Sequence, residues 1–252
     1  MTDLQKASFG KRIVAGILDG ILISILAVGL AALLSGILGY DNYMNTVNEA
    51  YARYESEYGV EFQINEEQYE ALTEDQRTNW DTAYKALTED KEVNYAYNML
   101  INLTMVILTS SVLLSVIVIE FVVPLLFGNG QTLGKKIFGI ALMHIDGIKV
   151  SSVQLFARAV LGKFAIELMI PLSIIMMVFF NMMGVVGIII LAALLIAQIA
   201  CLAITRTNAL IHDVLASTVA VDMASQQIFD TREALLEHTK KIHAEQASRS
   251  TY

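Results

Sequence analysis

Long apolar stretches separated by polar segments dominate the pattern of hydrophobic and polar positions along this chain. Four stretches are long enough to cross a hydrocarbon core, which takes about 20 apolar residues. They cover residues 13–38, 99–127, 153–180 and 183–204. The first is too long for the apolar core of a signal peptide, and Asp19 interrupts it, so we expect a retained helix. Few residues around Asn181 separate the last two stretches, which predicts a tight helical hairpin.

This pattern predicts an all-α fold, a polytopic membrane helix bundle with four transmembrane helices and a small helical extracytoplasmic insert. In chain order, the expected segments are the N-terminus with the first helix (1–40), the insert (41–98), the second helix (99–127), a cytoplasmic amphipathic segment (128–152), the third and fourth helices (153–204) and a cytoplasmic C-terminal segment (205–252).

The distribution of charge predicts the orientation. Lysine and arginine gather before the first span, between the second and third, and after the fourth, so the positive-inside rule places both termini in the cytoplasm of a multi-pass cell-membrane protein. Residues 41–98 hold 14 acids and 4 bases, a net charge of −10. Since the whole chain carries −8, the remainder carries +2, and the acidic insert should lie outside.

The acidic insert has the pattern of short helices. A segment starting at Tyr84 nearly repeats one starting at Tyr69, and in each a threonine followed by acids (Thr73 and Thr88) suits a helix start. Gly59 is expected to end a helix, and the last helix should run into the second span. We interpret the insert as a solvated helical cap, with a cation-attracting vestibule or a partner-docking surface as alternatives. A charged helix is expected after Ser225.

Composition excludes several classes of protein. With 55% hydrophobic and 17% charged residues, the chain is neither an ordinary cytosolic globule nor disordered. The acidic balance argues against a nucleic-acid partner. Cys201 is the one cysteine, and the four histidines lack metal-ligand spacing, so neither a metal nor another cofactor is expected. No nucleophile–base constellation is visible, and we do not expect an enzyme.

Ionisable residues inside the apolar stretches are the main candidates for function, because charges are costly in a membrane. Three acids and two bases lie at similar depths, where they can neutralise one another; they are Asp19, Glu120, Arg158, Lys163 and Glu167. One interpretation is a structural ion-pair network that fixes helix register. The other is an ion or proton pathway through the same groups.

Both prolines stand four residues after one of these glutamates, Pro124 after Glu120 and Pro171 after Glu167. Proline cannot donate to the carbonyl at i−4, so each glutamate would lose a helical hydrogen bond at its own carbonyl. A carboxylate beside a freed carbonyl in a kinked helix suits a hard cation or a proton-bearing water. The spacing favours the pathway interpretation.

A glycine-containing segment follows the second span and forms a candidate motif loop: Gly130, Gln131, Thr132, Gly134, Lys135 and Lys136. It is not a phosphate loop, because the glycine spacing is short and Lys136 stands where serine or threonine is needed. We interpret it as a short amphipathic element, with its apolar side chains on one face and Lys135 and Lys136 directed toward lipid phosphates.

Three blocks together resemble the RDD family of membrane proteins: residues 9–19, residues 130–140 with Asp146 and Gly147, and residues 210–221. The resemblance covers about 9–222 apart from the insert. It implies a bacterial integral membrane protein for which transport, including cation/proton exchange, has been suggested. The arginine and two aspartates of the family name correspond to Arg12, Asp19 and Asp213. The chain departs in its longer insert and in Ser217, where glycine is usual.

The positions of these motif residues favour a functional site at the cytoplasmic face. Arg12 and Asp19 are seven residues apart and share a helical stripe, so Arg12 can reach headgroup level or hold a lipid phosphate while Asp19 points into the bundle. His212 and Asp213, just past the fourth span, are expected to meet Lys135, Lys136 or Arg158.

Our leading hypothesis is transport of a small ion or solute, with exchange of a monovalent cation for protons as its specific form. Asp19 and Glu120 would be the central carboxylates, with Glu167 deeper. The alternative is a non-transporting scaffold or assembly partner with structural intramembrane ion pairs. The expected partners are the lipid bilayer and a small cation or proton. Four helices enclose little room, which favours a homo-oligomer.

Overall fold

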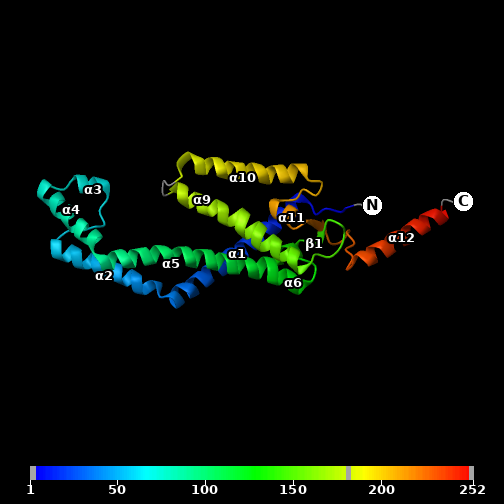
Figure 1. Ribbon diagram of the computed structural model, residues 1–252, viewed down its shortest axis with the longest axis horizontal. Coiled ribbons are helices and arrows are strands. Elements are labelled where there is room, and N and C mark those ends of the chain that lie inside the picture. The colour runs from blue at the N-terminus through cyan, green and yellow to red at the C-terminus, as the bar shows by residue number, and fades with distance from the viewer. Residues whose placement is uncertain (1–3, 180–182, 250–252) are drawn as a thin grey trace. The chain divides into compact units, whose positions relative to one another are not determined.

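The computed structural model describes residues 4–179 and 183–249, and the chain divides into two units (Figure 1). The larger unit consists of Met1–Ala27 and Val112–Tyr252, and the smaller unit is Val28–Ser111. Helices make up 76% of the structure. The predicted all-α class is therefore confirmed.

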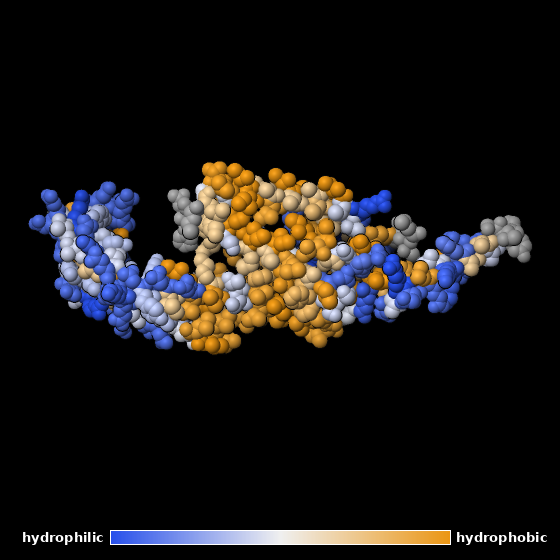
Figure 2. Space-filling view, in the orientation of Figure 1, coloured by the Kyte–Doolittle hydropathy of each residue, from blue (hydrophilic) through white to orange (hydrophobic). Residues whose placement is uncertain are grey.

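Four helical stretches among the described residues are long and apolar enough to cross a membrane. These are helix α1 (Phe9–Leu38), a continuous stretch Lys91–Phe127, another at Ser152–Val178, and helix α10 (Gly184–Ile204). They confirm the four predicted spans, although the first two helical stretches begin at Phe9 and Lys91, earlier than the predicted starts at residues 13 and 99. Their surfaces are mostly exposed and apolar, as Figure 2 shows over the long helices, so they contact lipid and the chain is an integral membrane protein.

The second and third spans each change from α-helix to π-helix part way along. Helix α5 (Lys91–Val116) passes into π-helix η1 (Ile117–Val122) and then helix α6 (Val123–Phe127). Helix α8 (Ser152–Phe156) passes into π-helix η2 (Ala157–Met169) and then helix α9 (Ile170–Phe179).

Each π-helix ends just before the residue that precedes a proline, so a wider helical turn occupies the place where the sequence predicted a kink. Where η1 ends, the Val123 N–H donates to the carbonyl of Val118, five residues earlier. At the end of η2 the Ile170 N–H donates to Ala165 in the same way. The two prolines thus follow segments with i→i+5 hydrogen bonding.

Helices α9 and α10 pack closely, as expected of a hairpin. Gly187 permits the approach, because an added Cβ there would lie 2.5 Å from Val178 and 3.3 Å from Ile174. The turn predicted around Asn181 lies outside the described residues.

A two-stranded antiparallel sheet, which the sequence did not predict, closes one end of the larger unit. Strand β1 (Ile140–His144) pairs with strand β2 (Thr218–Asp222), with Ile140 opposite Asp222 and His144 opposite Thr218. The first four residues of each strand are buried, because apolar clusters cover both faces of the sheet. Short helices α7 (Leu133–Ile137) and α11 (Ile211–Leu215) precede the two strands, and helix α12 (Arg232–Arg249) ends the described chain.

The smaller unit contains helices α2 (Tyr40–Tyr58), α3 (Glu66–Glu70) and α4 (Glu74–Glu89). Gly59 ends α2 with φ +63°, the left-handed conformation that glycine adopts without strain. Thr73 caps α4 and forms a capping box with Gln76, as its position before acids predicted. The prediction for Thr88 was wrong: it lies inside α4, and Asp90 instead accepts the Glu92 N–H at 2.9 Å, at the start of α5.

Aromatic side chains give the smaller unit its own packing. Phe62 contacts Tyr51 and Trp80 edge to face, and Trp80 stacks on Tyr84. The Trp80 indole N–H donates to the Glu61 carbonyl at 3.0 Å. These contacts stabilise a folded cap despite its polar surface.

Candidate functional site

The larger unit buries a network of charged side chains, which we call the charge network. Among the described residues it joins four carboxylates, four bases and one histidine: Asp19, Glu120, Glu167, Asp213, Arg12, Lys135, Arg158, Lys163 and His212. With a neutral histidine its formal charges cancel. Such balance is what a low-dielectric environment requires of buried charges.

Arg158 of η2 lies at the centre of the charge network. Its Nε donates to Asp213 Oδ1 at 2.9 Å, and its Nη1 donates to Glu120 Oε2 at 3.4 Å. Its Nη2 lies 2.8 Å from Nε2 of His212. The Arg158 side chain is 4% exposed, so these contacts replace the hydration of its guanidinium. One side chain thereby connects η2 to η1 and to α11.

Glu120 contacts the two lysines of the charge network. Lys163 Nζ donates to its Oε1, and Lys135 Nζ lies 3.5 Å from its Oε2. Arg158 and Lys163 are five residues apart, which would separate them by about 140° on an α-helix. The i→i+5 bonding of the π-helix brings residues five apart to nearly the same side, so both reach Glu120.

Asp213 links the first span to α11. Arg12 Nη2 lies 3.2 Å from its Oδ2, Thr218 Oγ1 donates to its Oδ1 at 3.2 Å, and Arg12 Nη1 donates to the Asn208 carbonyl at 2.7 Å. Burial alone would raise the pKa of Asp213, but His212, Arg158 and Arg12 hold it well below its usual range. The Arg12 guanidinium turns inward to Asp213, and the expectation that it also holds a lipid phosphate stays a prediction.

Asp19 holds the motif loop against α1. Its carboxylate accepts from the Thr132 hydroxyl and, at 2.8 Å, from the Gly134 N–H, both at the start of α7. Thr132 is also the N-cap of α7, since its Oγ1 accepts the Lys135 N–H at 3.3 Å. Lys135 Nζ lies 3.9 Å from Asp19 Oδ2. The carboxylate of Asp19 therefore lies at the N-terminus of α7, where the helix favours a negative charge.

Gly130 and Gln131 of the motif loop have structural roles. Gly130 has φ +64°, and an added Cβ would lie 2.9 Å from Cβ of Leu142. Gln131 Nε2 donates to the Ile140 carbonyl at 2.8 Å, which attaches the loop to β1.

The prediction that both lysines of the loop face lipid phosphates was wrong for Lys135. Its side chain is 10% exposed and lies between two carboxylates, where burial lowers its pKa to about 8. Lys136 Nζ lies 3.7 Å above the ring of Phe127, a cation–π contact.

His212 and Glu167 form the most distinctive contact of the charge network. Nδ1 of His212 lies 2.8 Å from both carboxylate oxygens of Glu167, and the His212 backbone N–H donates to Oε1 at 3.1 Å. Gly162 admits this approach, because a Cβ there would lie 2.5 Å from Cβ of His212. Burial lowers the pKa of His212, although Asp213 opposes the shift.

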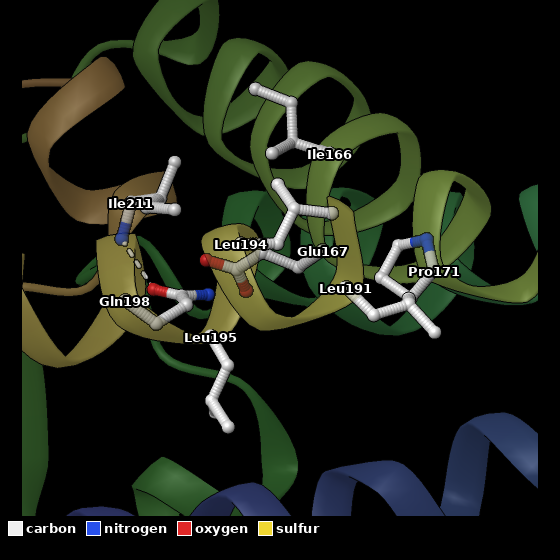
Figure 3. A pocket seen from close by; sticks show the side chains of 8 residues that line it. All are labelled: Ile166, Glu167, Pro171, Leu191, Leu194, Leu195, Gln198 and Ile211. Carbon is white, nitrogen blue, oxygen red and sulfur yellow. Dashed lines mark hydrogen bonds between the residues drawn. The ribbon is translucent and has the colours of Figure 1, made fainter. Parts of the chain in front are cut away.

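Each member of this pair lines a cavity of its own. The Glu167 cavity, about 250 Å³, lies among η2, α9, α10 and α11, and Figure 3 shows the carboxylate of Glu167 beside Gln198. The His212 cavity, about 210 Å³, is lined by His212, Arg158, Lys163, Lys135, Arg12 and Asp213 together with apolar residues of α1 and α10. The Glu167–His212 contact thus connects the linings of two separate spaces.

The structure brings together all five intramembrane candidates and pairs Arg12 with Asp213. His212 and Asp213 of α11 were expected to contact Lys135, Lys136 or Arg158, and the contact with Arg158 is present. Two contacts were not foreseen: Lys135 was assigned to the lipid side, and His212 was expected to meet the bases but not Glu167. The place of His212 beside Asp213 in one motif block was the available signal. In residues 4–179 and 183–249, no group of three His, Cys, Asp or Glu side chains could hold a metal.

Comparison with known proteins gives one match. The family model described as RDD family covers residues 6–217, which include every member of the charge network. Neither a curated protein nor a solved structure matches the chain.

The close approach of α7 to α1 makes Gly134 sensitive to substitution. An added Cβ would lie 2.9 Å from Asp19 Oδ1 and would also collide with the Ala15 carbonyl, so Gly134→Ala should cost about 1–3 kcal/mol of unfolding free energy. Gly20→Ala is the matched control, because nothing lies within 4 Å of an added Cβ and alanine favours the helix. Denaturant titration in detergent measures the unfolding free energy of both variants. Equal stabilities of the two would contradict the close packing of α7 against α1.

Removing the charge of Asp213 should expose how much the charge network depends on it. Asp213→Asn removes the carboxylate that Arg158 and Arg12 share and leaves the network with one uncompensated positive charge, at a cost of about 3–5 kcal/mol. Because the pKa of Asp213 is lowered in the fold, its contribution is present above the unfolded pKa and is lost as pH falls through acid values, so the variant should also lose stability less steeply on acidification.

Asp222 supplies the control for this variant, since its pair with Lys11 at 2.9 Å is more exposed. Asp222→Asn should change unfolding free energy by about 1 kcal/mol or less. A loss as large as that of Asp213→Asn would contradict a special role for the buried pair.

Proposed function

We propose that this chain, which belongs to the RDD family and is an integral membrane protein, moves a small ion or solute across the bilayer, with Glu167, beside His212, carrying a coupled proton. The observation that supports the proposal is the Glu167–His212 contact, whose two members line separate cavities. A proton that enters the Glu167 cavity can bind this carboxylate and leave it again when a second ion takes its place. The proposal is for a carrier and not for an enzyme.

The chemistry of the pair suits this role. Because arginine only donates, Nε2 of His212 accepts from Arg158 and Nδ1 carries the hydrogen that Glu167 accepts at 2.8 Å, which stabilises the ionised carboxylate and favours release of a bound proton. Arg158, on the other ring nitrogen of His212, disfavours the imidazolium, so the histidine stays neutral and the transported proton stays with Glu167. Intramembrane groups of this kind are typical of proton relays.

A monovalent cation is the ion we favour as the exchange partner of the proton. The Glu167 cavity offers a carboxylate and the amide oxygen of Gln198, which accepts the Ile211 N–H at 3.0 Å. Oxygen ligands of this type suit hard cations. Binding of a cation at Glu167 would displace the proton of the carboxylate into the cavity, which couples the two movements.

The proposal changes the roles first expected for the other carboxylates. Asp19 and Glu120, expected to be central, each have donors at close range: Asp19 holds α7, and Glu120 holds three bases. We assign them the positioning of η2 and α7 around the pair. On the positive-inside rule, the end that carries β1 and β2 would face the cytoplasm of a bacterial cell. The expected homo-oligomer stays a prediction.

Flux in reconstituted vesicles tests this function. With a potassium or sodium gradient across proteoliposomes, Glu167→Gln should reduce cation-driven proton flux to the level of protein-free vesicles, because the amide cannot release a proton. Glu237→Gln, in an exposed i,i+4 pair of α12, is the matched control and should retain wild-type flux. Gel filtration and circular dichroism check that both variants fold. Undiminished flux in folded Glu167→Gln would overturn the proposal.

A non-transporting scaffold is the alternative, and the balanced pairing of the charge network favours it. Every carboxylate of the network contacts a base or His212, which is the arrangement expected if the charges serve to fix helix register. Under this alternative the wild-type protein shows no flux with any ion, and Glu167→Gln lowers stability alone.

A further inference from the structure

A groove runs between the start of α1 and the end of α10 in the larger unit. It comprises the His212 cavity and a neighbouring space of about 360 Å³, the Lys6 cavity, which share the lining residues Phe9, Arg12 and Leu202. Apolar side chains form the walls, from Phe9 and Ile13 on one side and from Ile199 and Leu202 on the other. We call these two cavities together the basic groove.

The lining of the basic groove carries an excess of positive charge. Five bases line it, namely Lys6, Arg12, Lys135, Arg158 and Lys163, and Asp213 is the one carboxylate among the lining residues described. Glu120 and Asp19 bind some of these bases but do not line the groove. A ligand in the groove therefore meets the cationic side of the charge network.

The position of the groove matches the boundary of a bilayer. Phe9 begins one apolar span and Ile204 ends another, and the groove is lined by residues close to both ends. The headgroups of a membrane lie where spanning helices leave the hydrocarbon. Lys6 is exposed at this end, with its Nζ donating to the Arg206 carbonyl at 2.9 Å.

We propose that the basic groove binds the phosphate headgroup of an anionic phospholipid beside Arg12 and Lys6. The acyl chains would lie along the exposed apolar faces of α1 and α10, where Val14 and Ile199 are 47% and 57% exposed. Basic pockets between spanning helices, with apolar walls that open to lipid, are the arrangement that holds such headgroups. This inference does not depend on transport, since a scaffold would bind the same lipid.

Two pairs of variants test the groove in the full-length protein. Lys6→Gln removes a base from the mouth, and Lys11→Gln removes the nearby lysine that pairs with Asp222 outside the groove. Ala203→Phe fills the groove from α10 without changing charge, and Ile204→Phe places the same ring at a position that is 82% exposed and does not line it.

The measurement is lipid retained on purified protein, by native mass spectrometry, after incubation with vesicles of phosphatidylglycerol and phosphatidylcholine or of phosphatidylcholine alone. We expect selective retention of phosphatidylglycerol, reduced about fivefold by Lys6→Gln, at least as strongly by Ala203→Phe, and unchanged in the two controls. Retention should also fall with added salt.

Three results would overturn the proposal. Equal retention of the two lipids would remove selectivity for anions. Retention of phosphatidylglycerol that neither groove variant lowers would place the lipid elsewhere. Inorganic phosphate alone, tested by its effect on the melting temperature, would point to a free anion if it stabilised the protein as much as phosphatidylglycerol vesicles do.

Discussion

The buried ion pair between Arg158 and Asp213 is the interaction on which the rest of the larger unit depends. Neither charge tolerates a dry environment alone, so each needs the other and further partners. Arg158 reaches Glu120 of η1, and Asp213 reaches Arg12 of α1. The pair thus connects three spans and α11, elements that lie far apart in the chain and expose most of their apolar surface to lipid. Where apolar contact between helices is sparse, such polar contacts specify how helices meet.

The same interaction orders the groups to which we assign function. Because Arg158 contacts His212 as well as Asp213, it holds the imidazole between itself and Glu167. The π-helix η2 allows this, since it directs Arg158 and Lys163 to one carboxylate and carries Glu167 one further turn along. Asp19 performs a parallel task at α7, where it fixes the loop that delivers Lys135 to Glu120. Structure and proposed proton transfer therefore rest on one set of contacts.

Much of this arrangement could be predicted from the sequence, for physical reasons that particular residues illustrate. Apolar length identified the four spans, and Gly59 and Thr73 marked helix ends because their local backbone preferences act without tertiary help. The cost of burying charge singled out Glu120 and Arg158. The strands β1 and β2 could not be anticipated, since five-residue strands acquire stability from partners far away in the chain, such as Val221, which faces Ala141 from 80 residues away. Lys135 was misplaced because its sequence does not reveal that α7 turns inward.

The central claim is that Arg158 and Asp213 stabilise the fold as a coupled pair, and a double-mutant cycle tests it most directly. Unfolding free energies in detergent would be compared for Arg158→Met, Asp213→Leu and the double variant. Each single change should cost about 3–5 kcal/mol by leaving the buried charge network with one uncompensated charge, while the double variant, which restores the balance, should lose far less than the sum. If the two losses simply add, the pair is not coupled and this account of the larger unit is wrong.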